Sequence, residues 1–334
     1  MSTLREVARR AGVSVATASR VANGGFAVRP ETRDRVERAM RELLYVPPGR
    51  RDVTGLIGVL VPELANPVFP ALAQAIETRA APSGLASILC NTTGAAFREV
   101  DYVHMLLDRR VEGMIFISCE MTNLRGDHSH YAHLVAEGAR IVFVNGAMHT
   151  LDVPSVGVDE RAAGEIATQH LIDLGHERIG FVAGREHYLP TQLKGAGRAS
   201  AMAGAGLEPD GLVAHADFGI EGGGRALADL LARPVPPTAV ICSSDVMAIG
   251  ALHEAVRQGL RVPDDFSIVG FDGIDGATWT QPALTTVEQP IDEIAGTAVS
   301  ALQTLIDEPD QAVPSVTFRP QLRIGGTTAA RSEA

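Results

Sequence analysis

Short apolar segments alternate with amphipathic ones along most of the chain, from Gly55 onward. Seven apolar runs have the length of buried strands: Leu56–Val61, Ala86–Cys90, Met114–Ser118, Ile141–Asn145, Ile179–Ala183, Ala239–Ser243 and Ile268–Phe271. Between them, apolar residues recur with helical spacing in Phe69–Ala80, Phe97–Leu107, Ala162–Leu174 and Val246–Gln258. This alternation predicts right-handed βαβ crossovers and parallel sheets covered by helices on both faces. The segment is too long for one sheet of ordinary size, so we expect two similar lobes with a ligand cleft between them.

The first residues carry helix signals instead. Thr3 and Glu6 have the spacing of a capping box, in which hydroxyl and carboxylate satisfy exposed amide donors at a helix start. Gly12 is expected to end this first helix in a tight turn, and Ser14 to cap a second helix that runs through Val21. Two short helices joined by a glycine turn predict a helix-turn-helix.

A third helix is predicted to follow, with Pro30 in its first turn. It places Val36, Met40, Leu43 and Leu44 on one face, where they can pack against the first two helices. Together, these three short amphipathic helices predict an all-α head.

Charge separates this head from the rest of the chain. Residues 1–51 contain eleven arginines and five acidic residues, a net charge of +6. The other residues include 18 basic and 35 acidic ones, a net charge of −17. A basic head on an acidic body suggests that the head binds a polyanion. A solvated, arginine-rich helix face explains the same charge, and charge alone leaves both interpretations open.

The second helix has the composition of a helix that approaches a DNA duplex. Ser14, Thr17 and Ser19 are small and hydroxylated, so they allow the backbone to come close to phosphates. Arg20 can donate two hydrogen bonds to O6 and N7 of a guanine in the major groove. An ordinary helical hairpin with a polar surface is the alternative interpretation.

The sequence of residues 3–24, TLREVARRAGVSVATASRVANG, resembles the N-terminal signature of the lactose-repressor (LacI) family. Pro30–Arg33 and Leu44–Pro47 resemble its third helix and exit. The resemblance implies that the second helix lies in the major groove, with Val15, Ala16 and Arg20 facing base edges. It assigns phosphate contacts to seven residues: Thr3, Ser14, Thr17, Ser19, Asn23, Arg29 and Thr32. Tyr45 belongs to the same expected DNA-binding set.

The resemblance continues through the body in six segments: Ile57–Phe69, Val111–Ile115, His170–Gly180, Ser244–Gly250, Val269–Asp272 and Pro282–Val287. It implies an all-α helix-turn-helix domain at 1–46 and a two-lobed α/β core of the type I periplasmic-binding-protein-like fold at 55–328, with parallel sheets. Lobe 1 is expected at about 55–157 and 290–317, lobe 2 at about 158–289 and 318–328, and a tail at 329–334. The core is also expected to form a homodimer.

An effector site is implied by position in the family. Its expected residues are Asn66, Pro67 and Phe69 from lobe 1, and Asp159, Lys194, Arg198, Phe218, Ser244 and Asp272 from lobe 2. These types suit a sugar-like polyol, because carboxylates accept from hydroxyls, a guanidinium donates to them and an aromatic ring packs on their C–H face. Asp159 can instead cap the helix that it precedes, and Phe218 can be a core residue. Asp245 is expected to cap its helix rather than to bind ligand.

Two of these positions depart from the family's usual residues. Lys194 stands where a smaller polar residue is common, and Ser244 where asparagine is frequent. Both departures leave the identity of the effector open.

The linker departs further from the family. Residues 47–54 are roughly five residues short of the usual hinge helix, and Pro48 and Gly49 disfavour a helix. They contain no leucine, so we predict that the minor-groove wedge of the family is missing. Arg50 and Arg51 remain as candidates for minor-groove or phosphate contacts. A flexible tether without DNA contact is the alternative.

The sequence offers no catalytic constellation. It has no glycine-rich dinucleotide fingerprint, P-loop or Gly-x-Ser-x-Gly elbow, and Lys194 is its only lysine. We therefore expect neither enzyme activity nor a cofactor. His128, His130 and His133 gather near Asp127, where a solvated loop and helix start is favoured over a metal site.

Nothing in the sequence predicts membrane insertion or export. No uncharged apolar run reaches the roughly 18 residues of a membrane span, and the N-terminus lacks the apolar stretch of a signal peptide, so a cytoplasmic location is expected. Cys90, Cys119 and Cys242 each stand in an apolar run, which favours buried thiols in a reducing compartment.

These features favour a homodimeric DNA-binding transcription regulator that binds a pseudo-palindromic operator. Its resemblance suggests a repressor of genes for carbohydrate uptake or breakdown, controlled by a small sugar-like effector. The alternative from another class is a cytoplasmic α/β protein that binds or processes sugars, with a basic head of other purpose.

Overall fold

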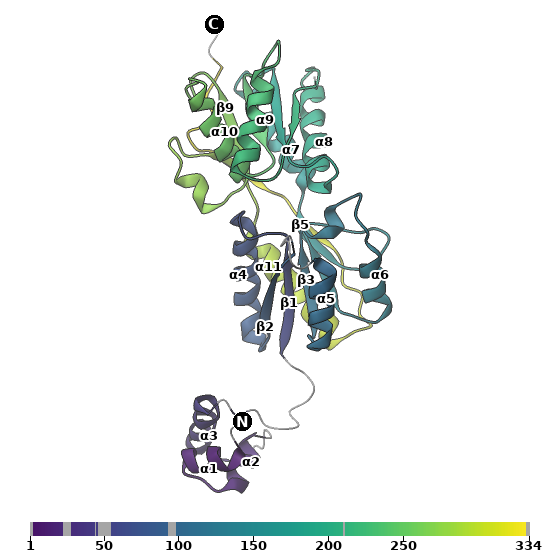
Figure 1. Cartoon of the computed structure of the whole chain (residues 1–334), viewed down its shortest axis with the longest axis vertical. Helices are drawn as coiled ribbons and strands as arrows, with labels where there is room; N and C mark the ends of the chain where they lie inside the picture. Colours follow the sequence, from purple (N-terminus) through teal and green to yellow (C-terminus); the bar gives the residue numbers. More distant parts are fainter. Residues whose placement is uncertain are drawn as a thin grey trace. The chain divides into compact units, whose positions relative to one another are not determined.

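The computed structural model describes residues 3–22, 28–43, 45, 55–92, 98–209 and 211–331, and it divides into two compact units, residues 1–54 and 55–334 (Figure 1). Asn23, Arg50, Arg51 and the remainder of the 47–54 linker lie outside the described residues. What we expect of them therefore stays a prediction.

The head contains α1 (Leu4–Ala11), α2 (Val15–Ala22) and α3 (Pro30–Glu42). The predicted capping box is present, because Glu6 N donates to Thr3 Oγ1 (3.4 Å) and Thr3 N donates to Glu6 Oε2 (2.6 Å). Gly12 ends α1 in the left-handed conformation (φ 66°), and Ser14 Oγ accepts from Thr17 N (3.1 Å) at the start of α2. The core of the head joins all three helices: Val7, Ala8, Ala11, Ala18, Val21, Val36 and Ala39.

Lobe 1 of the second unit is a six-stranded parallel sheet with the order β11-β5-β4-β3-β1-β2. Its strands are β1 (Leu56–Val61), β2 (Ala86–Asn91), β3 (Gly113–Ile117), β4 (Ile141–Val144), β5 (Ser155–Val158) and β11 (Val316–Phe318). Its helices are α4 (Val68–Ala80), α5 (Glu99–Asp108), α6 (Ser129–Ala136) and α11 (Ile291–Asp307), with the short 3₁₀ turns η1 (Ala81–Ser83) and η2 (Glu120–Thr122). Side chains alternate across the sheet: Ile57 and Val59 pack with α4 and α11, whereas Leu60 and Phe116 pack with α5 and α6.

Lobe 2 repeats this plan with the strand order β12-β10-β9-β8-β6-β7, in which β12 alone is antiparallel to its neighbour. Its strands are β6 (Ile179–Ala183), β7 (Val213–His215), β8 (Ala239–Cys242), β9 (Ser267–Asp272), β10 (Thr285–Glu288) and β12 (Gln321–Arg323). Its helices are α7 (Glu160–Asp173), α8 (Leu189–Gly204), α9 (Ile220–Leu231) and α10 (Asp245–Arg257), with the 3₁₀ turn η3 (Asp275–Thr278). Helices flank the sheet of each lobe (Figure 1).

The predicted fold class is confirmed: a helix-turn-helix head and a two-lobed α/β core with parallel sheets. All seven apolar runs coincide with strands, and the four amphipathic stretches overlap α4, α5, α7 and α10, each with its bounds shifted by one or two residues. The chain passes between lobes after β5, after β10 and between β11 and β12. Part of the expected tail is packed, because Arg331 N donates to Leu174 O (2.8 Å) of lobe 2.

Cys90, Cys119 and Cys242 are buried and form no disulfide with one another. Burial raises the pKa of Cys90 to about 11 and that of Cys119 well above the ordinary range of a thiol. Among the helices of the described ranges, none is long and apolar enough to cross a membrane.

Candidate effector site and DNA-binding head

The carboxyl ends of strands from both lobes meet at a cavity of about 330 Å³, which we call the inner cavity. Such a position is expected for a ligand site of parallel α/β sheets. Lobe 1 lines it with Pro62, Glu63, Asn66, Val68, Phe69, Ser118, Thr122 and Asn145. Lobe 2 and the strand connections line it with Glu160, Arg185, Tyr188, Pro190, Lys194, Asp217, Phe218, Ser243, Ser244, Phe271, Asp272 and Gln289.

A buried ion pair between α7 and α8 forms part of the lining. The two helices can approach this closely because Gly164 and Gly197 have no Cβ. A Cβ at Gly164 would lie 2.2 Å from a backbone oxygen of α8, and a Cβ at Gly197 would lie 2.0 Å from a backbone oxygen of α7. This contact brings Lys194 Nζ onto the Glu160 carboxylate and 3.7 Å from the centroid of the Phe271 ring. Burial raises the pKa of Glu160, and the nearby Lys194 ammonium opposes this effect.

Asp272 links the lobes at the end of β9. Its backbone is in the left-handed region (φ 123°), which is strained for a residue other than glycine. Its buried carboxylate accepts from Gln289 Nε2 (2.8 Å) and from Asn66 Nδ2 of lobe 1 (3.4 Å), and Asn145 Nδ2 donates to Gln289 Oε1 (2.7 Å). Burial, and then the charge of Asp245, raise the pKa of Asp272 well above its usual range. These amides hold Asp272 where a bound ligand would contact both lobes.

The rim of the inner cavity is aromatic and charged. Arg185 Nε donates to Asp217 Oδ1 (2.8 Å), and both side chains are at least half exposed. The rings of Tyr188 and Phe218 meet edge to face, with centroids 6.4 Å apart. Burial raises the pKa of Glu63, and the Arg185 charge opposes it. The cavity therefore offers ring faces, amides and carboxylates, the groups that bind polyols.

Six of the residues expected at the effector site line the inner cavity: Asn66, Phe69, Lys194, Phe218, Ser244 and Asp272. Three others lie elsewhere. Asp159 Oδ1 accepts from Ala162 N (2.9 Å) and caps α7, so its carboxylate is turned to the helix start. Arg198 is one turn beyond Lys194, and its Nε donates to Ile179 O (2.9 Å) inside lobe 2. Pro67, at the start of α4, lines a separate groove.

The prediction that Asp245 caps α10 is wrong. Ser244 is the cap, because its Oγ accepts from Met247 N (3.3 Å). Asp245 instead accepts from Gly273 N (2.8 Å), Ile274 N (2.9 Å) and Thr286 Oγ1 (2.6 Å). It thereby anchors the backbone that directly follows Asp272.

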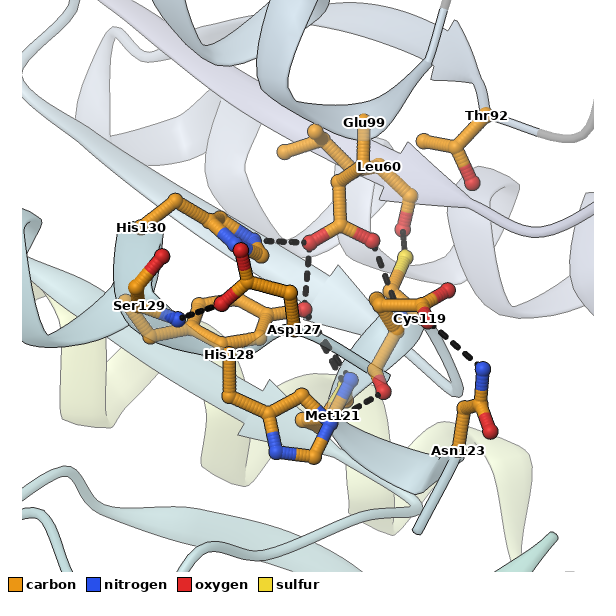
Figure 2. Close-up of polar contacts among 12 residues, drawn as sticks. Leu60, Thr92, Glu99, Cys119, Met121, Asn123, Asp127, His128, Ser129 and His130 are labelled. Atoms are coloured by element: carbon orange, nitrogen blue, oxygen red, sulfur yellow. Dashed lines mark hydrogen bonds and ion pairs between the residues drawn. The ribbon is translucent and has the colours of Figure 1, made fainter. Parts of the chain in front are cut away.

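The histidine-rich segment is, as expected, a largely solvated loop and helix start, because Asp127, Ser129 and His133 are exposed and α6 begins at Ser129. Two of its side chains, His130 and Tyr131, turn inward and form a buried polar cluster with Glu99. The Glu99 carboxylate accepts from Tyr131 Oη, from His130 Nε2 (2.8 Å) and from Glu120 N (2.9 Å) (Figure 2). His130 and Glu99 are only 11% and 7% exposed, and His128 Nε2 lies 2.9 Å from the Glu120 carbonyl oxygen. Within the described part of the chain, no three histidine, cysteine or acidic residues are placed to hold a metal ion.

This cluster positions the cleft loop, which we define as residues 118–124. Ser118 and Thr122 of the loop line the inner cavity. Leu124 N donates to His187 O of lobe 2 (2.9 Å), and Asn123 forms a β-bridge with Tyr188. By accepting a hydrogen bond from Glu120 N, Glu99 therefore fixes the position of a loop that contacts both the inner cavity and lobe 2. The sequence missed this link because its members are about 20 to 30 residues apart and share no motif.

In the head, α2 buries one face and exposes the other. Ala18, Val21 and Ala22 are buried, whereas Arg20 and Ala16 are exposed and Val15 is 45% exposed. The hydroxyls of Thr3 and Ser14 already take part in helix caps. Thr17 Oγ1 lies 2.8 Å from Ser14 Oγ, Arg29 is exposed, and Thr32 and Tyr45 are half-buried.

A helix-turn-helix head followed by a two-lobed core with a cavity between its sheets defines a ligand-responsive, DNA-binding regulator. Residues 3–48 match the model of bacterial regulatory proteins of the lacI family, and residues 168–328 match the periplasmic binding protein-like domain. The chain is 40% identical to the uncharacterized HTH-type transcriptional regulator in the aml 5′ region of Streptomyces limosus, over 98% of this chain and 94% of that protein. The chain belongs to the LacI family of bacterial transcriptional regulators.

Solved structures support the same assignment over the whole chain. The lac repressor dimer bound to operator and the anti-inducer ONPF superimposes with a TM-score of 0.82 at 28% identity, covering 98% of this chain and 99% of that one. The complex of the transcriptional regulator CelR with cellobiose superimposes with a TM-score of 0.73 at 28% identity, covering 98% and 100%.

Proposed function

We propose that this regulator is a homodimeric repressor of genes for carbohydrate uptake or breakdown, and that a neutral, polyhydroxylated effector in the inner cavity controls its affinity for operator DNA. The composition of that cavity carries the proposal. Its lining includes four carboxylates, Glu63, Glu160, Asp217 and Asp272, against two cations, Arg185 and Lys194. Because Lys194 pairs with Glu160 and Arg185 with Asp217, both cations of the lining are already neutralised and do not favour a phosphorylated or acidic effector, whereas hydroxyls donate well to carboxylates.

The effector would act on the spacing of the lobes. Asn66 of lobe 1 already donates to Asp272 of lobe 2, and the cleft loop donates to His187. A ligand that contacts both lobes changes the free-energy difference between their closed and open arrangements. Through this difference, binding of the effector changes the affinity of the regulator for operator DNA. Such coupling is reciprocal and typically worth about 1–3 kcal/mol.

Base reading is assigned to the exposed face of α2. Arg20 would read a guanine, and Val15 and Ala16 would contact base edges beside it. Phosphate contacts are assigned to Thr3, Ser14, Thr17, Ser19, Asn23, Arg29 and Thr32. Tyr45 is assigned to the same DNA-binding set, and Arg50 and Arg51 to minor-groove or phosphate contacts. The capping hydroxyls of Thr3 and Ser14 can still accept this role, because a hydroxyl both donates and accepts.

A second copy of the chain is proposed to bind an apolar groove that is lined mainly by lobe 2, together with Ala65 and Pro67 of lobe 1. Its lining includes Ile249 and Leu252 of α10, together with exposed Ile220 (49%), Val256 (63%) and Trp279 (81%). Exposed apolar surface of this kind is typical of interaction sites. Val256→Asp is expected to give a monomer in analytical ultracentrifugation, and an unchanged dimer would move the interface elsewhere.

DNA binding and effector control are tested together. Footprinting on the DNA upstream of the chain's own gene and its neighbours identifies the operator, and a panel of neutral sugars, sugar phosphates and nucleosides is then added. Arg20→Ala is expected to lose about 1–3 kcal/mol of preference for operator over random duplex. The exposed Arg35 of α3 provides the control, since Arg35→Ala should leave that preference unchanged.

Effector binding is tested with two variants of the inner cavity, Lys194→Met and Asp272→Asn. Both should lose the effector response in calorimetry and keep operator binding in its absence. A response to sugar phosphates but not to neutral sugars contradicts the proposed effector class. Variants that still bind the effector normally place its site outside the inner cavity.

A further inference from the structure

A second hollow adjoins the inner cavity on the surface of lobe 2. This outer pocket, about 410 Å³, is lined by Arg185, Glu186, His187, His215, Ala216, Asp217, Arg225, Ala226 and Asp229. Arg185 and Asp217 line both hollows. The ion pair between them is therefore the boundary between the two hollows.

This boundary is suited to a bound polyol. An arginine–carboxylate pair presents donors and acceptors side by side, which matches the neighbouring hydroxyls of a sugar ring. The pair is solvent-exposed, with side chains 50% and 66% accessible, so its own contribution to stability is small and it can exchange partners easily. Tyr188 and Phe218 stand beside it in the inner cavity and offer ring faces to the C–H side of a sugar.

The outer pocket, like the Arg185–Asp217 pair at its boundary, is lined by arginine and carboxylate side chains. Arg225 and Asp229 are exposed and one turn apart on α9, so their side chains lie on one helix face. His215 Nδ1 lies 2.8 Å from the Gly184 carbonyl oxygen, which fixes its ring at the end of β7. Two arginines face three carboxylates among the lining residues, so no net positive charge favours an anion.

We propose that the effector site has two subsites, and that the effector is a neutral glycoside of at least two sugar rings. One ring occupies the inner cavity, the glycosidic link crosses the Arg185–Asp217 pair, and the next ring occupies the outer pocket. This inference rests on the proposed function, because it assumes that the inner cavity binds a sugar.

The two subsites have different roles because they contact different parts of the protein. The inner cavity is lined by both lobes, so its ring sets their spacing. The outer pocket is lined by lobe 2 alone, so its ring adds affinity and selects chain length without changing the spacing. An outer-pocket variant should therefore weaken binding of an oligosaccharide and leave its maximal effect on DNA unchanged.

Calorimetry on the full-length protein tests the two-subsite inference with series of sugars, here called ladders, that increase from one ring to two or three. The ladders are glucose, maltose and maltotriose; glucose, cellobiose and cellotriose; galactose and lactose; and xylose and xylobiose. For the ladder that binds, the two-ring member is expected to bind at least roughly 10-fold more tightly than its monosaccharide. The double variant Arg225→Ala/Asp229→Ala should lose roughly 10-fold in affinity for two or more rings and keep the affinity for one ring. Operator release at saturating sugar should match that of the wild type.

The matched control is Glu221→Ala/Arg233→Ala, which removes an exposed acid in the first turn of α9 and an exposed arginine two residues after its end, both outside the pocket. It should bind every sugar as the wild type does. Equal affinity for one and two rings, or an Arg225→Ala/Asp229→Ala variant that binds disaccharide normally, overturns the two-subsite inference alone. If none of these sugars binds the wild type but another neutral polyol, such as a nucleoside, does, the two-subsite inference fails and the proposed function stands. If no neutral polyol binds, both fail.

Discussion

In each lobe of the core, a buried carboxylate at the first position of a helix holds a loop at the cleft, and the two carboxylates have different partners. Glu99, the first residue of α5, holds the cleft loop through Glu120 N. Asp245, the first residue of α10, holds the loop after β9 through Gly273 N and Ile274 N. In both lobes, backbone amides of a loop therefore donate hydrogen bonds to a buried acid, which fixes the position of the loop.

Their other partners differ in chemistry. Glu99 faces the His130 ring and the Tyr131 hydroxyl, and burial together with the Glu99 charge raises the pKa of Tyr131 far above its usual range, so the phenol stays a donor. Asp245 faces one hydroxyl, that of Thr286, and lies near a second acid, Asp272. Burial raises the pKa of Asp245 to about 6. This raised pKa lies directly beside the effector site, because Asp245 holds the backbone that follows Asp272.

The largest expected effect comes from removing the lobe 1 anchor. Glu99→Ala leaves a ring N–H, a phenol and an amide without their acceptor, and is expected to lower the free energy of unfolding by about 3–5 kcal/mol. Glu99→Gln should cost only about 1 kcal/mol, because the amide of glutamine can donate to a histidine that switches tautomer. Urea denaturation followed by circular dichroism measures both.

The control for this anchor is Asp108→Ala, an exposed acid at the other end of α5. It is expected to leave the free energy of unfolding within about 0.5 kcal/mol of wild type. Equal losses for the alanine and glutamine variants of Glu99 would show that charge, rather than the number of satisfied donors, stabilises the cluster.

Lobe 2 is expected to provide the pH dependence. The raised pKa of Asp245 means that the folded state binds more protons than the unfolded state between pH 3.8 and about 6. The free energy of unfolding should therefore fall as pH rises through this window, by about 2–3 kcal/mol from this group. Asp245→Asn mimics the protonated acid, and it should remove that fall and also lower the pKa of Asp272.

Denaturation of wild type and Asp245→Asn between pH 4 and 7.5 measures the difference. Asp310→Asn, an exposed acid of the same core, should follow the wild-type curve. If Asp245→Asn keeps the full pH dependence, other buried acids of the cleft carry it, and Glu160 is then the first to examine, since burial raises its pKa too.

Much of the fold could be predicted because central parallel strands are buried on both faces and read as continuous apolar runs. Several of the elements that were not predicted lack that signal. β7, β11 and β12 are three-residue strands at or near sheet edges, and α9 begins Ile-Glu-Gly-Gly-Gly, where three glycines conceal the helix. The helices of the head could be predicted because the residues that form a helix cap or a turn are close together in the sequence.

The ends of the strands and the positions of the family's effector residues predicted where the site lies, but not which side chains face it. Lys194 and Arg198 are one turn apart on α8, and only the packing of α7 against it shows which one faces the cavity. Asp159 and Glu160 are neighbours, yet one caps the helix and the other pairs with Lys194. Such one-residue differences depend on tertiary contacts that no local pattern encodes.

The smallest expected effect concerns the one hydroxyl that supports Asp245. Thr286→Val keeps the buried shape and removes the hydrogen bond to Asp245 Oδ1, so it should cost about 1–2 kcal/mol of unfolding free energy at pH 7.5. Because this hydroxyl lowers the pKa of Asp245, its loss raises that pKa further and the cost should shrink below pH 5, where the acid is protonated. The neighbouring Thr285 is equally buried but bonds to neutral groups, Thr328 Oγ1 and Gly325 N, so Thr285→Val should cost about 1 kcal/mol at every pH. If the two valine variants show the same pH profile, the Thr286 hydroxyl does not act through the Asp245 charge.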